Sequence, residues 1–309
     1  MLAERPRLGF IGLGSVAYHM AKGLHEEEGY ERILAYCDGP RNRPPYTPAF
    51  KDKAAGAGVT LVNTLAELAT GSDLILSAVT AASTLDVVQQ TAPHLTPRHM
   101  FVDMNSASPE VKERAAEMCA ARGATFVDCV ILGGPSMLKH HVLLWTSAPG
   151  AVEFARVMNK YHMQIRVIDG PAGAAARVKL LRSVLMKSLE AALWETTLAA
   201  HKAGLDDVVR EVAFEWMDTM KFSFFANRLI CTGAIHARRR VEEVDEVVAM
   251  VRKLGMEPMV AEAARRRLAG IAALGLKDYF NAEEPKDYRK VLEAVDTLVA
   301  RRAERAKEQ

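Results

Sequence analysis

The feature that most constrains this chain is a glycine turn between an apolar segment and a helical pattern, within residues 8–24. Residues 8–11 are apolar and predict a short buried strand. Gly12, Gly14 and Ala17 follow with the spacing G-x-G-x-x-A, and apolar positions then repeat at helical spacing. This order places free backbone N–H groups beside a turn without bulky side chains, which suits a dinucleotide pyrophosphate. The cofactor-contacting residues predicted here are Gly12, Leu13, Gly14, Ser15, Val16 and Ala17.

The acidic residue at the end of the second predicted strand helps to determine whether the cofactor is NAD or NADP. The strand over residues 31–38 ends in Asp38. An acidic side chain at this point accepts hydrogen bonds from the adenosine ribose, which favours NAD. Arg41 and Arg43 follow closely, and a guanidinium pair would instead hold the 2′-phosphate of NADP. We expect NAD or NADP, with a slight preference for NAD because the Asp38 carboxylate would repel a phosphate.

Alternating strand and helix patterns predict an α/β fold with a doubly wound, mostly parallel Rossmann sheet. Residues 72–80 form a continuous apolar run, as expected of a parallel strand that is buried on both faces. This run ends in Val79 and Thr80, which are expected at the carboxyl edge of the sheet, where ligands bind in such folds. Other strands are predicted over residues 58–62, 99–109, 123–134, 141–149 and 164–170.

After Gly173 the sequence no longer contains convincing strand patterns. We therefore predict a dinucleotide-binding Rossmann domain over residues 1–170 and an all-helical substrate and dimerisation domain over residues 171–309. The first helix of the second domain is expected to form the hinge, with its N-terminal turns facing the cofactor cleft. The apolar faces of these helices exceed what one chain can hide, so a homodimer is expected. The predicted helices span residues 174–203, 206–230, 240–254, 258–275 and 285–307.

Composition excludes several classes of function. The formal net charge of +2 over 309 residues predicts no nucleic-acid partner and no anionic membrane surface. No segment approaches the roughly 18 uninterrupted apolar residues of a membrane span, and the N-terminus lacks a signal-peptide pattern. The four cysteines are scattered without metal-like pairing, so we expect buried thiols, no metal site and a cytoplasmic protein.

Four segments occur in the order of the motifs of a known family. They read GFIGLGSVAYHMAKGL, DMNSASP, FVDCVILGG and GPAGAAARVKLLRS. They resemble the opening GFIGLGxMGxxMAxNL, the D-x-S-T-x-x-P turn, the strand ending in S-G-G and the segment G-x-G-x-x-x-K-x-x-x-N of the β-hydroxyacid dehydrogenases. That family includes 3-hydroxyisobutyrate and 6-phosphogluconate dehydrogenases, and the resemblance covers residues 7–205. The later helices resemble a little-characterised C-terminal domain from one branch of the family.

Lys179 matches the catalytic lysine of the fourth segment. Alcohol oxidation needs a base that takes the hydroxyl proton while hydride leaves for the nicotinamide. A lysine can do this if burial and neighbouring cations lower its pKa. Arg182, Ser183 and Lys187 share its helix face, and a solvated basic stripe is the alternative interpretation. The predicted catalytic residues are Lys179, Ser183 and Lys187.

Three further segments are predicted to bind the substrate. The polar turn at 103–109 offers hydrogen bonds to substrate or nicotinamide, and Asn105 is also assigned to the cofactor; its alternative role is a helix cap. The glycines that end the strand at 123–134 offer N–H groups to a carboxylate, unless they only form a turn. The basic run HARRR at 236–240, placed at a helix start, would close over an anionic substrate unless it is solvated surface. The predicted residues are Asn105, Ser106, Gly133, Gly134, His236 and Arg239.

Two positions depart from the family pattern. Leu132 replaces the serine of S-G-G, and Ser183 replaces the asparagine of the catalytic segment. Because both family residues contact substrate, these changes predict a substrate different from those of the characterised members. The resemblance implies an NAD(P)-dependent dehydrogenase or reductase that acts on the CH–OH group of a small hydroxy acid or reduces the oxo acid. Reduction of an imine or another carbonyl compound is one alternative. A non-catalytic NAD(P)-binding sensor is another, although a pure binder has no need of Lys179.

Overall fold

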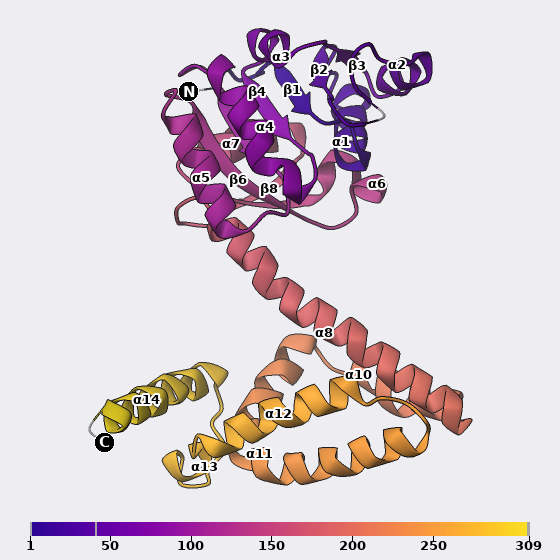
Figure 1. Ribbon diagram of the computed structural model, residues 1–309, viewed down its shortest axis with the longest axis vertical. Helices are drawn as coiled ribbons and strands as arrows, with labels where there is room; N and C mark the ends of the chain where they lie inside the picture. The colour runs from indigo at the N-terminus through magenta and orange to yellow at the C-terminus, as the bar shows by residue number, and fades with distance from the viewer. Residues whose placement is uncertain (1, 41, 308–309) are drawn as a thin grey trace. The chain divides into compact units, whose positions relative to one another are not determined.

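In the computed structural model, which describes residues 2–40 and 42–307, the strands form a sheet with the order β3-β2-β1-β4-β5-β6-β7-β8 (Figure 1). Neighbouring strands are parallel except β6 and β7, which pair antiparallel. The predicted doubly wound, mostly parallel sheet is therefore confirmed. The strands are β1 Leu8–Ile11, β2 Ile33–Tyr36, β3 Val59–Leu61, β4 Leu74–Ser77, β5 Met100–Asp103, β6 Thr125–Leu132, β7 Leu143–Ser147 and β8 Gln164–Val167.

Helices cover both faces of this sheet. Side chains from α1, α2 and α7 join one buried apolar cluster, and side chains from α3, α4 and α5 join another. Adjacent β1 residues Phe10 and Ile11 belong to different clusters, because successive strand residues point to opposite faces. The helices are α1 Ser15–Glu26, α2 Pro48–Ala55, α3 Leu65–Gly71, α4 Thr84–Thr91, α5 Pro109–Ala120, α6 Pro135–Leu138 and α7 Ala151–Met158.

The chain divides into two compact units, Met1–Ser183 and Val184–Gln309. The long helix α8 Ala174–Ala203 contributes its first turns to the first unit and its remainder to the second. The boundary predicted at residue 170 falls between β8 and α8, and a functional division at that residue stays a prediction. Within the described parts of the chain, no helix has the length and apolar character needed to cross a membrane.

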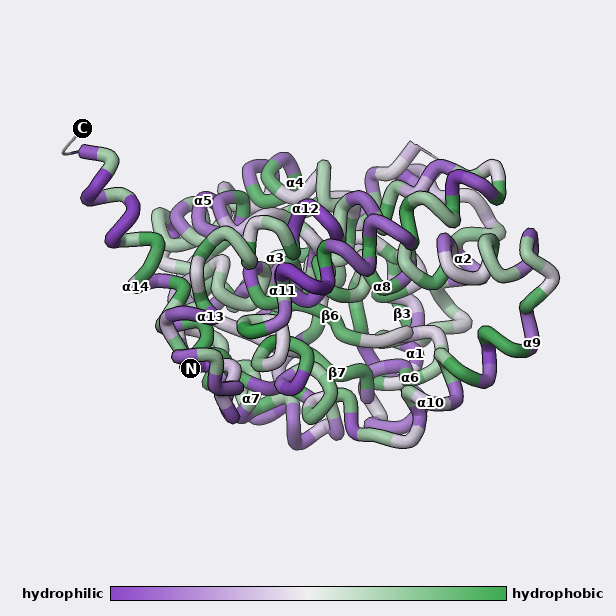
Figure 2. The backbone as a smooth tube through the Cα atoms, turned by 90° about the horizontal axis from the view of Figure 1, so that it is seen from below, coloured by the Kyte–Doolittle hydropathy of each residue, from purple (hydrophilic) through white to green (hydrophobic). Residues whose placement is uncertain are grey.

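The second unit is helical, and Figure 2 shows hydrophobic and hydrophilic residues interleaved along its helices. Glu195 of α8 accepts hydrogen bonds from the N–H groups of Val260 and Ala261, at 2.8 and 2.9 Å, and so caps α12. A small core forms around Cys231 and Leu276. The elements are α9 Asp206–Val209, the π-helical turn η5 Arg210–Glu215, α10 Trp216–Asp218, α11 Phe222–Lys253, α12 Met259–Ala273, α13 Leu276–Tyr279 and α14 Tyr288–Lys307.

The predicted helices over 206–230 and 240–254 are wrong in their boundaries. A π-helical turn and a break after Asp218 interrupt the first. The Thr219 hydroxyl donates to the Trp216 carbonyl oxygen at 2.7 Å. This side-chain hydrogen bond satisfies a carbonyl at the end of α10 that a continuing helix would otherwise satisfy with a backbone N–H. Helix α11 then runs without interruption through residues 230–240. The HARRR run therefore lies inside a helix and not at a helix start.

Candidate active site

A cavity of about 820 Å³ lies at the carboxyl edge of the parallel strands in the first unit. Residues that end or follow β1, β2, β4, β5 and β6 line it, as ligand sites in doubly wound sheets require. Of the predicted site residues, those that line the cavity are Gly12, Leu13, Gly14, Ser15, Val16, Asp38, Val79, Thr80, Asn105, Ser106, Gly133 and Lys179. Those outside its lining are Ala17, Gly134, Ser183, Lys187, His236 and Arg239.

The glycine turn fits a dinucleotide pyrophosphate. Gly12 has φ +88°, and a Cβ at this position would lie 2.6 Å from the Ala78 carbonyl oxygen. A Cβ on Gly14 would instead meet no described atom within 4 Å, so Gly14 leaves open space at the helix start. Among the described residues, no side chain caps the N-terminus of α1, and its first turn carries no acid. Its N–H groups are therefore available to an anion, while Ala17 packs into the core.

The cofactor-selecting region lies after β2. Asp38 is exposed and lines the cavity. Arg43 is exposed but does not line it, and Arg41 lies outside the described residues. The preference for NAD therefore stays a prediction that depends on the Asp38 carboxylate.

Asn105 holds together the two loops beneath the cavity. Its Oδ1 accepts a hydrogen bond from the Val79 N–H at 2.7 Å. Its Nδ2 donates to Ser77 Oγ at 3.1 Å and to Asp103 Oδ1 at 2.5 Å. These contacts use both amide hydrogens and join the turn after β5 to the end of β4. Asn105 thus positions this turn, and Ser106 is the residue of the turn whose side chain bonds to Lys179.

Lys179 reaches the cavity from the second turn of α8. Its Nζ donates to Ser106 Oγ at 2.6 Å, and the side chain is half-buried. Burial lowers the pKa of Lys179, and the nearby ammonium of Lys112 lowers it further, with a smaller contribution from Arg182. The Ser183 hydroxyl does not contact the Lys179 amine, because it donates to the Lys179 carbonyl oxygen at 2.9 Å.

A buried ionic network lies behind the turn that carries Ser106. Lys112, Asp103 and Asp128 are each wholly buried. Lys112 Nζ donates to the Asp103 carbonyl oxygen at 2.8 Å and lies 3.3 and 3.2 Å from the carboxylates of Asp103 and Asp128. Burial raises the pKa of Asp103. Buried charges persist only with such compensation, so these three side chains form one interdependent structure.

Asp128 connects this network to the helix that carries Lys179. Its Oδ2 accepts hydrogen bonds from the N–H groups of Gly173 and Ala176, both at 3.0 Å, and from Ser147 Oγ at 3.2 Å. The carboxylate therefore satisfies the free N–H groups at the start of α8 and matches the positive end of the helix dipole. Asp103 and Asp128 thus tie the Ser106 turn and the Lys179 helix to the same ammonium.

The sequence analysis missed this network, although the sequence contains a signal for it. Lys112 falls on the buried face of α5, in helical register with Pro109, Ala115 and Cys119. A cation on an otherwise small and apolar face needs a buried partner. Asp103 and Asp128 are candidate partners, because each is a single acid within an apolar strand.

Three of the predicted residues outside the cavity lining belong to the second unit. Lys187 pairs with Glu190 at 2.6 Å and is exposed. His236 and Arg239 line another pocket, of about 590 Å³, together with aromatic side chains and Arg228. His236 Nε2 lies 3.2 Å from Glu284 Oε1, and Arg239 pairs with Glu243. Their contact with a substrate stays a prediction.

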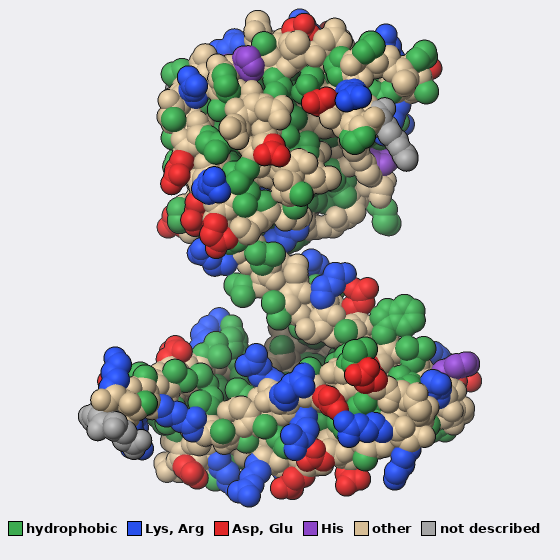
Figure 3. All heavy atoms as spheres, viewed as in Figure 1, with side chains coloured by type: hydrophobic (Ala, Val, Ile, Leu, Met, Phe, Trp, Pro, Cys, Tyr) green, Lys and Arg blue, Asp and Glu red, His purple; other side chains and the backbone are tan. Residues whose placement is uncertain are grey.

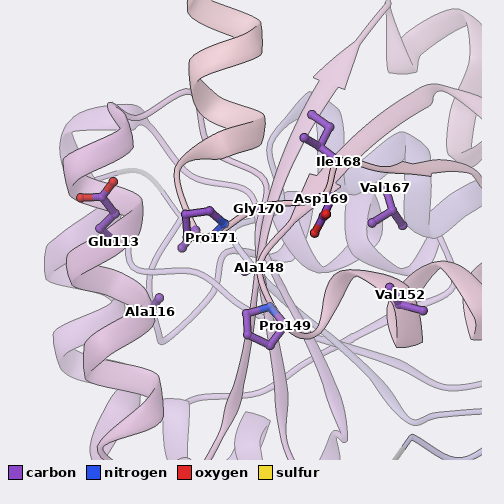
Figure 4. A pocket seen from close by; sticks show the side chains of 11 residues that line it. Glu113, Ala116, Ala148, Pro149, Val152, Val167, Ile168, Asp169, Gly170 and Pro171 are labelled. Atoms are coloured by element: carbon purple, nitrogen blue, oxygen red, sulfur yellow. The ribbon is translucent and has the colours of Figure 1, made fainter.

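A further cavity, of about 780 Å³, lies near the start of α8 and contains no predicted site residue (Figure 4). Pro149, Pro171 and Val152 are among the apolar residues that line it. Of its described lining residues, Glu113 and Asp169 are the charged ones, and no basic group accompanies them. The predicted cofactor-binding residues and Lys179 instead line the cavity at the carboxyl edge of the sheet.

Comparisons with known proteins identify the family of the chain. The family described as the NAD binding domain of 6-phosphogluconate dehydrogenase matches residues 7–157. A solved conserved protein of unknown function, reported as structurally similar to 3-hydroxyacid dehydrogenases, is 30% identical and has a TM-score of 0.57. The match covers 88% of this chain and 97% of that one. The chain belongs to the β-hydroxyacid dehydrogenase family. The predicted resemblance is therefore confirmed, and the fold is that of an NAD(P)-binding dehydrogenase or reductase.

Proteins with stated enzymatic activities are similar to this chain at lower sequence identity. The mitochondrial 3-hydroxyisobutyrate dehydrogenase of Drosophila melanogaster is 23% identical over 64% of this chain and 60% of its own length. A reductive aminase from Aspergillus terreus, solved with NADPH, is 19% identical over 89% of this chain and 99% of its own, with a TM-score of 0.70. The second similarity shows a shared fold. Residues 200–271 match a domain of unknown function (DUF1932).

Proposed function

We propose that this family member transfers a hydride between a nicotinamide cofactor and a small hydroxy or oxo acid, with Lys179 as the general acid and base. The observation that carries this proposal is the position of Lys179 Nζ, 2.6 Å from Ser106 Oγ, in the cavity that contains the glycine turn. The match to 3-hydroxyisobutyrate dehydrogenase supports an acid of this class as the substrate.

The proposed chemistry divides one alcohol oxidation between two acceptors. A nicotinamide cofactor held at the Gly12–Gly14 turn would supply the hydride acceptor. Neutral Lys179 takes the hydroxyl proton, so a carbonyl product and a lysine ammonium result. In the reverse direction the Lys179 ammonium returns the proton to the carbonyl oxygen. A lowered pKa makes the neutral amine more abundant near neutral pH, and the Ser106 hydroxyl orients the amine.

The cavity also suggests how an anionic substrate would be recognised. Gly133 lines it with φ +142°, at the end of the strand that resembles the family's substrate strand. Its backbone N–H offers a hydrogen bond to a substrate carboxylate. On the cofactor side, we propose a modest preference for NAD because Asp38 lines the cavity after β2.

Reduction of an imine or another carbonyl compound is the second candidate function. Leu132 and Ser183 stand where the hydroxyacid members carry serine and asparagine, so two substrate contacts of those members are altered. Lys179 would then serve as the proton donor. The same fold occurs in a reductive aminase that binds NADPH, which makes this reaction class compatible with the scaffold.

A substrate screen with matched variants tests both candidates. Hydroxy acids are supplied with NAD or NADP, and oxo acids or ketone–amine mixtures with the reduced cofactors, while nicotinamide absorbance is followed. For the best substrate, Lys179→Ala should lower kcat by about 10²–10⁴ and leave cofactor affinity unchanged. Lys179→Arg should not restore activity, because a guanidinium does not release its proton. The control Arg177→Ala changes an exposed cation on the same helix and should remain active. Near-normal kcat in Lys179→Ala would refute the proposed role.

A further inference from the structure

A second cluster of polar side chains lies on the first unit, where the end of α1 meets the segment after α6. Helix α1 packs against α6 and against the following 3-10 turn η3 Lys139–His141 (Figure 1). Carboxylates from the end of α1 face imidazoles from η3 and from the loop before β8. The cluster consists of Glu27, Glu28, His140, His141 and His162.

Three members of the cluster lie at the spacing of metal ligands. One ligand atom from each of Glu27, His140 and His141 falls within 4.8 Å of the other two. His141 Nε2 lies 2.8 Å from Glu27 Oε2. Metal–ligand bonds of about 2.0–2.2 Å place neighbouring ligand atoms of a tetrahedral site about 3.3–3.6 Å apart. Small side-chain adjustments would therefore bring the three atoms around one ion.

His140 has the hydrogen-bonding pattern of a metal-ligating histidine. The residue is wholly buried, and its Nε2 lies 3.2 Å from the Glu28 carboxylate. Its Nδ1 is buried and has no hydrogen-bond partner among the described residues. Ligating histidines generally donate their second ring nitrogen to a carboxylate, which fixes the ring and leaves the other nitrogen for the metal. A Cβ at Gly23 would lie 2.2 Å from Nδ1, so the glycine at this position makes room for the buried imidazole ring.

The neighbouring charges leave one oxygen of Glu27 available. Lys139 Nζ lies 2.7 Å from Glu27 Oε1 and 3.0 Å from Glu26 Oε2. Glu27 Oε2 instead faces His141. Glu28 is held separately, because its Oε1 also lies 2.8 Å from His162 Nδ1. An ion could therefore use Glu27 Oε2 while Lys139 keeps its contact with the other oxygen.

We propose that Glu27, His140 and His141 bind one divalent transition-metal ion of the Zn²⁺ class, with Glu28 orienting His140. Two imidazoles and one carboxylate suit Zn²⁺ better than the oxygen-preferring Mg²⁺ or Ca²⁺, and they leave a fourth position for water. The ion would join the end of α1, the helix that begins at the glycine turn, to the segment that follows β6. Cysteine spacing gives no sign of this site, because its ligands are histidines and a glutamate up to 114 positions apart.

Calorimetric titration of the full chain with Zn²⁺ alone, after chelator treatment, tests this site. The wild type should bind one ion per chain. His141→Ala should weaken binding by more than about 100-fold, since the loss of an outer partner alone costs about 10–100-fold. The His141 side chain is 40% exposed, so this variant should fold. His94→Ala removes an exposed histidine of the same unit and is the matched control, with affinity expected to be unchanged.

Two more measurements distinguish this site from non-specific binding of the metal to surface histidines. Co²⁺ in place of Zn²⁺ should give the visible absorption of a tetrahedral site, and His141→Ala should remove it. Glu28→Gln should weaken Zn²⁺ binding by about 10-fold or more, whereas Glu26→Gln should not. The absence of saturable binding, or equal affinities in His141→Ala and His94→Ala, would overturn the proposal. These readouts need no substrate and are independent of the proposed enzymatic activity.

Discussion

Lys112 shows at the level of one residue how the interior supports the candidate active site. Its ammonium contacts the Asp103 main chain and the carboxylates of Asp103 and Asp128. One carboxylate neighbours Asn105 and the Ser106 turn, and the other caps the helix of Lys179. Removing the cation would leave two buried carboxylates without their common partner.

Lys112→Met is therefore expected to destabilise the protein by about 3–5 kcal/mol, the usual effect of removing one partner from a buried ion pair. Urea unfolding followed by circular dichroism measures this change. Lys51→Met, at an exposed position of α2, should change stability by no more than about 0.5 kcal/mol. A loss below about 1 kcal/mol in Lys112→Met would contradict the network's role in stability.

The lowered pKa of Lys179 predicts opposite pH dependences for the two reaction directions. Oxidation needs the neutral amine, so kcat should rise as pH increases through the pKa of Lys179. Reduction needs the ammonium, so kcat should fall over the same range. Because Arg182 helps to lower this pKa, Arg182→Ala should move both limbs to higher pH. The pH dependence of kcat, measured in both directions with the best substrate of the screen, tests this. A kcat that rises with pH in both directions, or falls in both, would contradict it.

The sequence predicted a catalytic role for Lys179 but not the residues that most affect its pKa. Lys112 follows burial as a cause of the lowered pKa of Lys179, ahead of Arg182. Lys187, which the sequence analysis placed beside Lys179 on one helix face, pairs with Glu190 in the second unit. Helical spacing shows which residues share a face. The proximity of Lys112 depends on tertiary packing, which spacing does not encode.

At the level of elements, the β1–α1 turn separates a conformational requirement from a ligand requirement. Gly12 needs glycine because of its positive φ and the close Ala78 carbonyl. Gly14 has no such constraint, and its Cβ would enter open space. Gly14→Val should therefore leave the melting temperature nearly unchanged and abolish dinucleotide binding, because the side chain would occupy the pyrophosphate position.

A dinucleotide titration with parallel thermal unfolding measures both effects. Gly270→Val is the matched control, since a Cβ there also meets no described atom within 4 Å but lies on α12, outside the cavity. It should bind the cofactor normally. Wild-type affinity in Gly14→Val would remove this turn as the pyrophosphate site.

Local sequence signals predicted some elements better than others. Thr64 caps the start of α3 by accepting the Glu67 N–H at 3.1 Å, and a cap of this kind is a local signal because the two residues are neighbours in sequence. Apolar runs between glycine turns similarly predicted the buried strands. Residues 206–230 retain a helical pattern, yet a π-helical turn and a break divide them. Apolar periodicity did not reveal this interruption, which depends on the local backbone.

At the level of the whole molecule, the second unit carries many large apolar side chains that are exposed to solvent. Trp194 and Phe224 are 63% and 60% exposed. Figure 3 shows hydrophobic side chains among the lysines and arginines of this unit. Its buried apolar cluster is small, with Cys231, Ala234, Leu276, Val291 and Ala294 as its fully buried members. Exposed apolar faces of this kind are typical of surfaces that a partner covers.

We therefore expect a homodimer formed through the second unit. Light scattering at micromolar concentration should give a mass twice that of the 33.9 kDa chain. Trp194→Glu should shift the protein to a monomer, because it places a charge on an apolar surface that the partner would have to bury. Val152→Glu is the control: Val152 is 67% exposed on α7 in the first unit, and its replacement should leave the dimer intact. A monomeric wild type would contradict this assembly, and the exposed apolar residues of the second unit would then require a different partner.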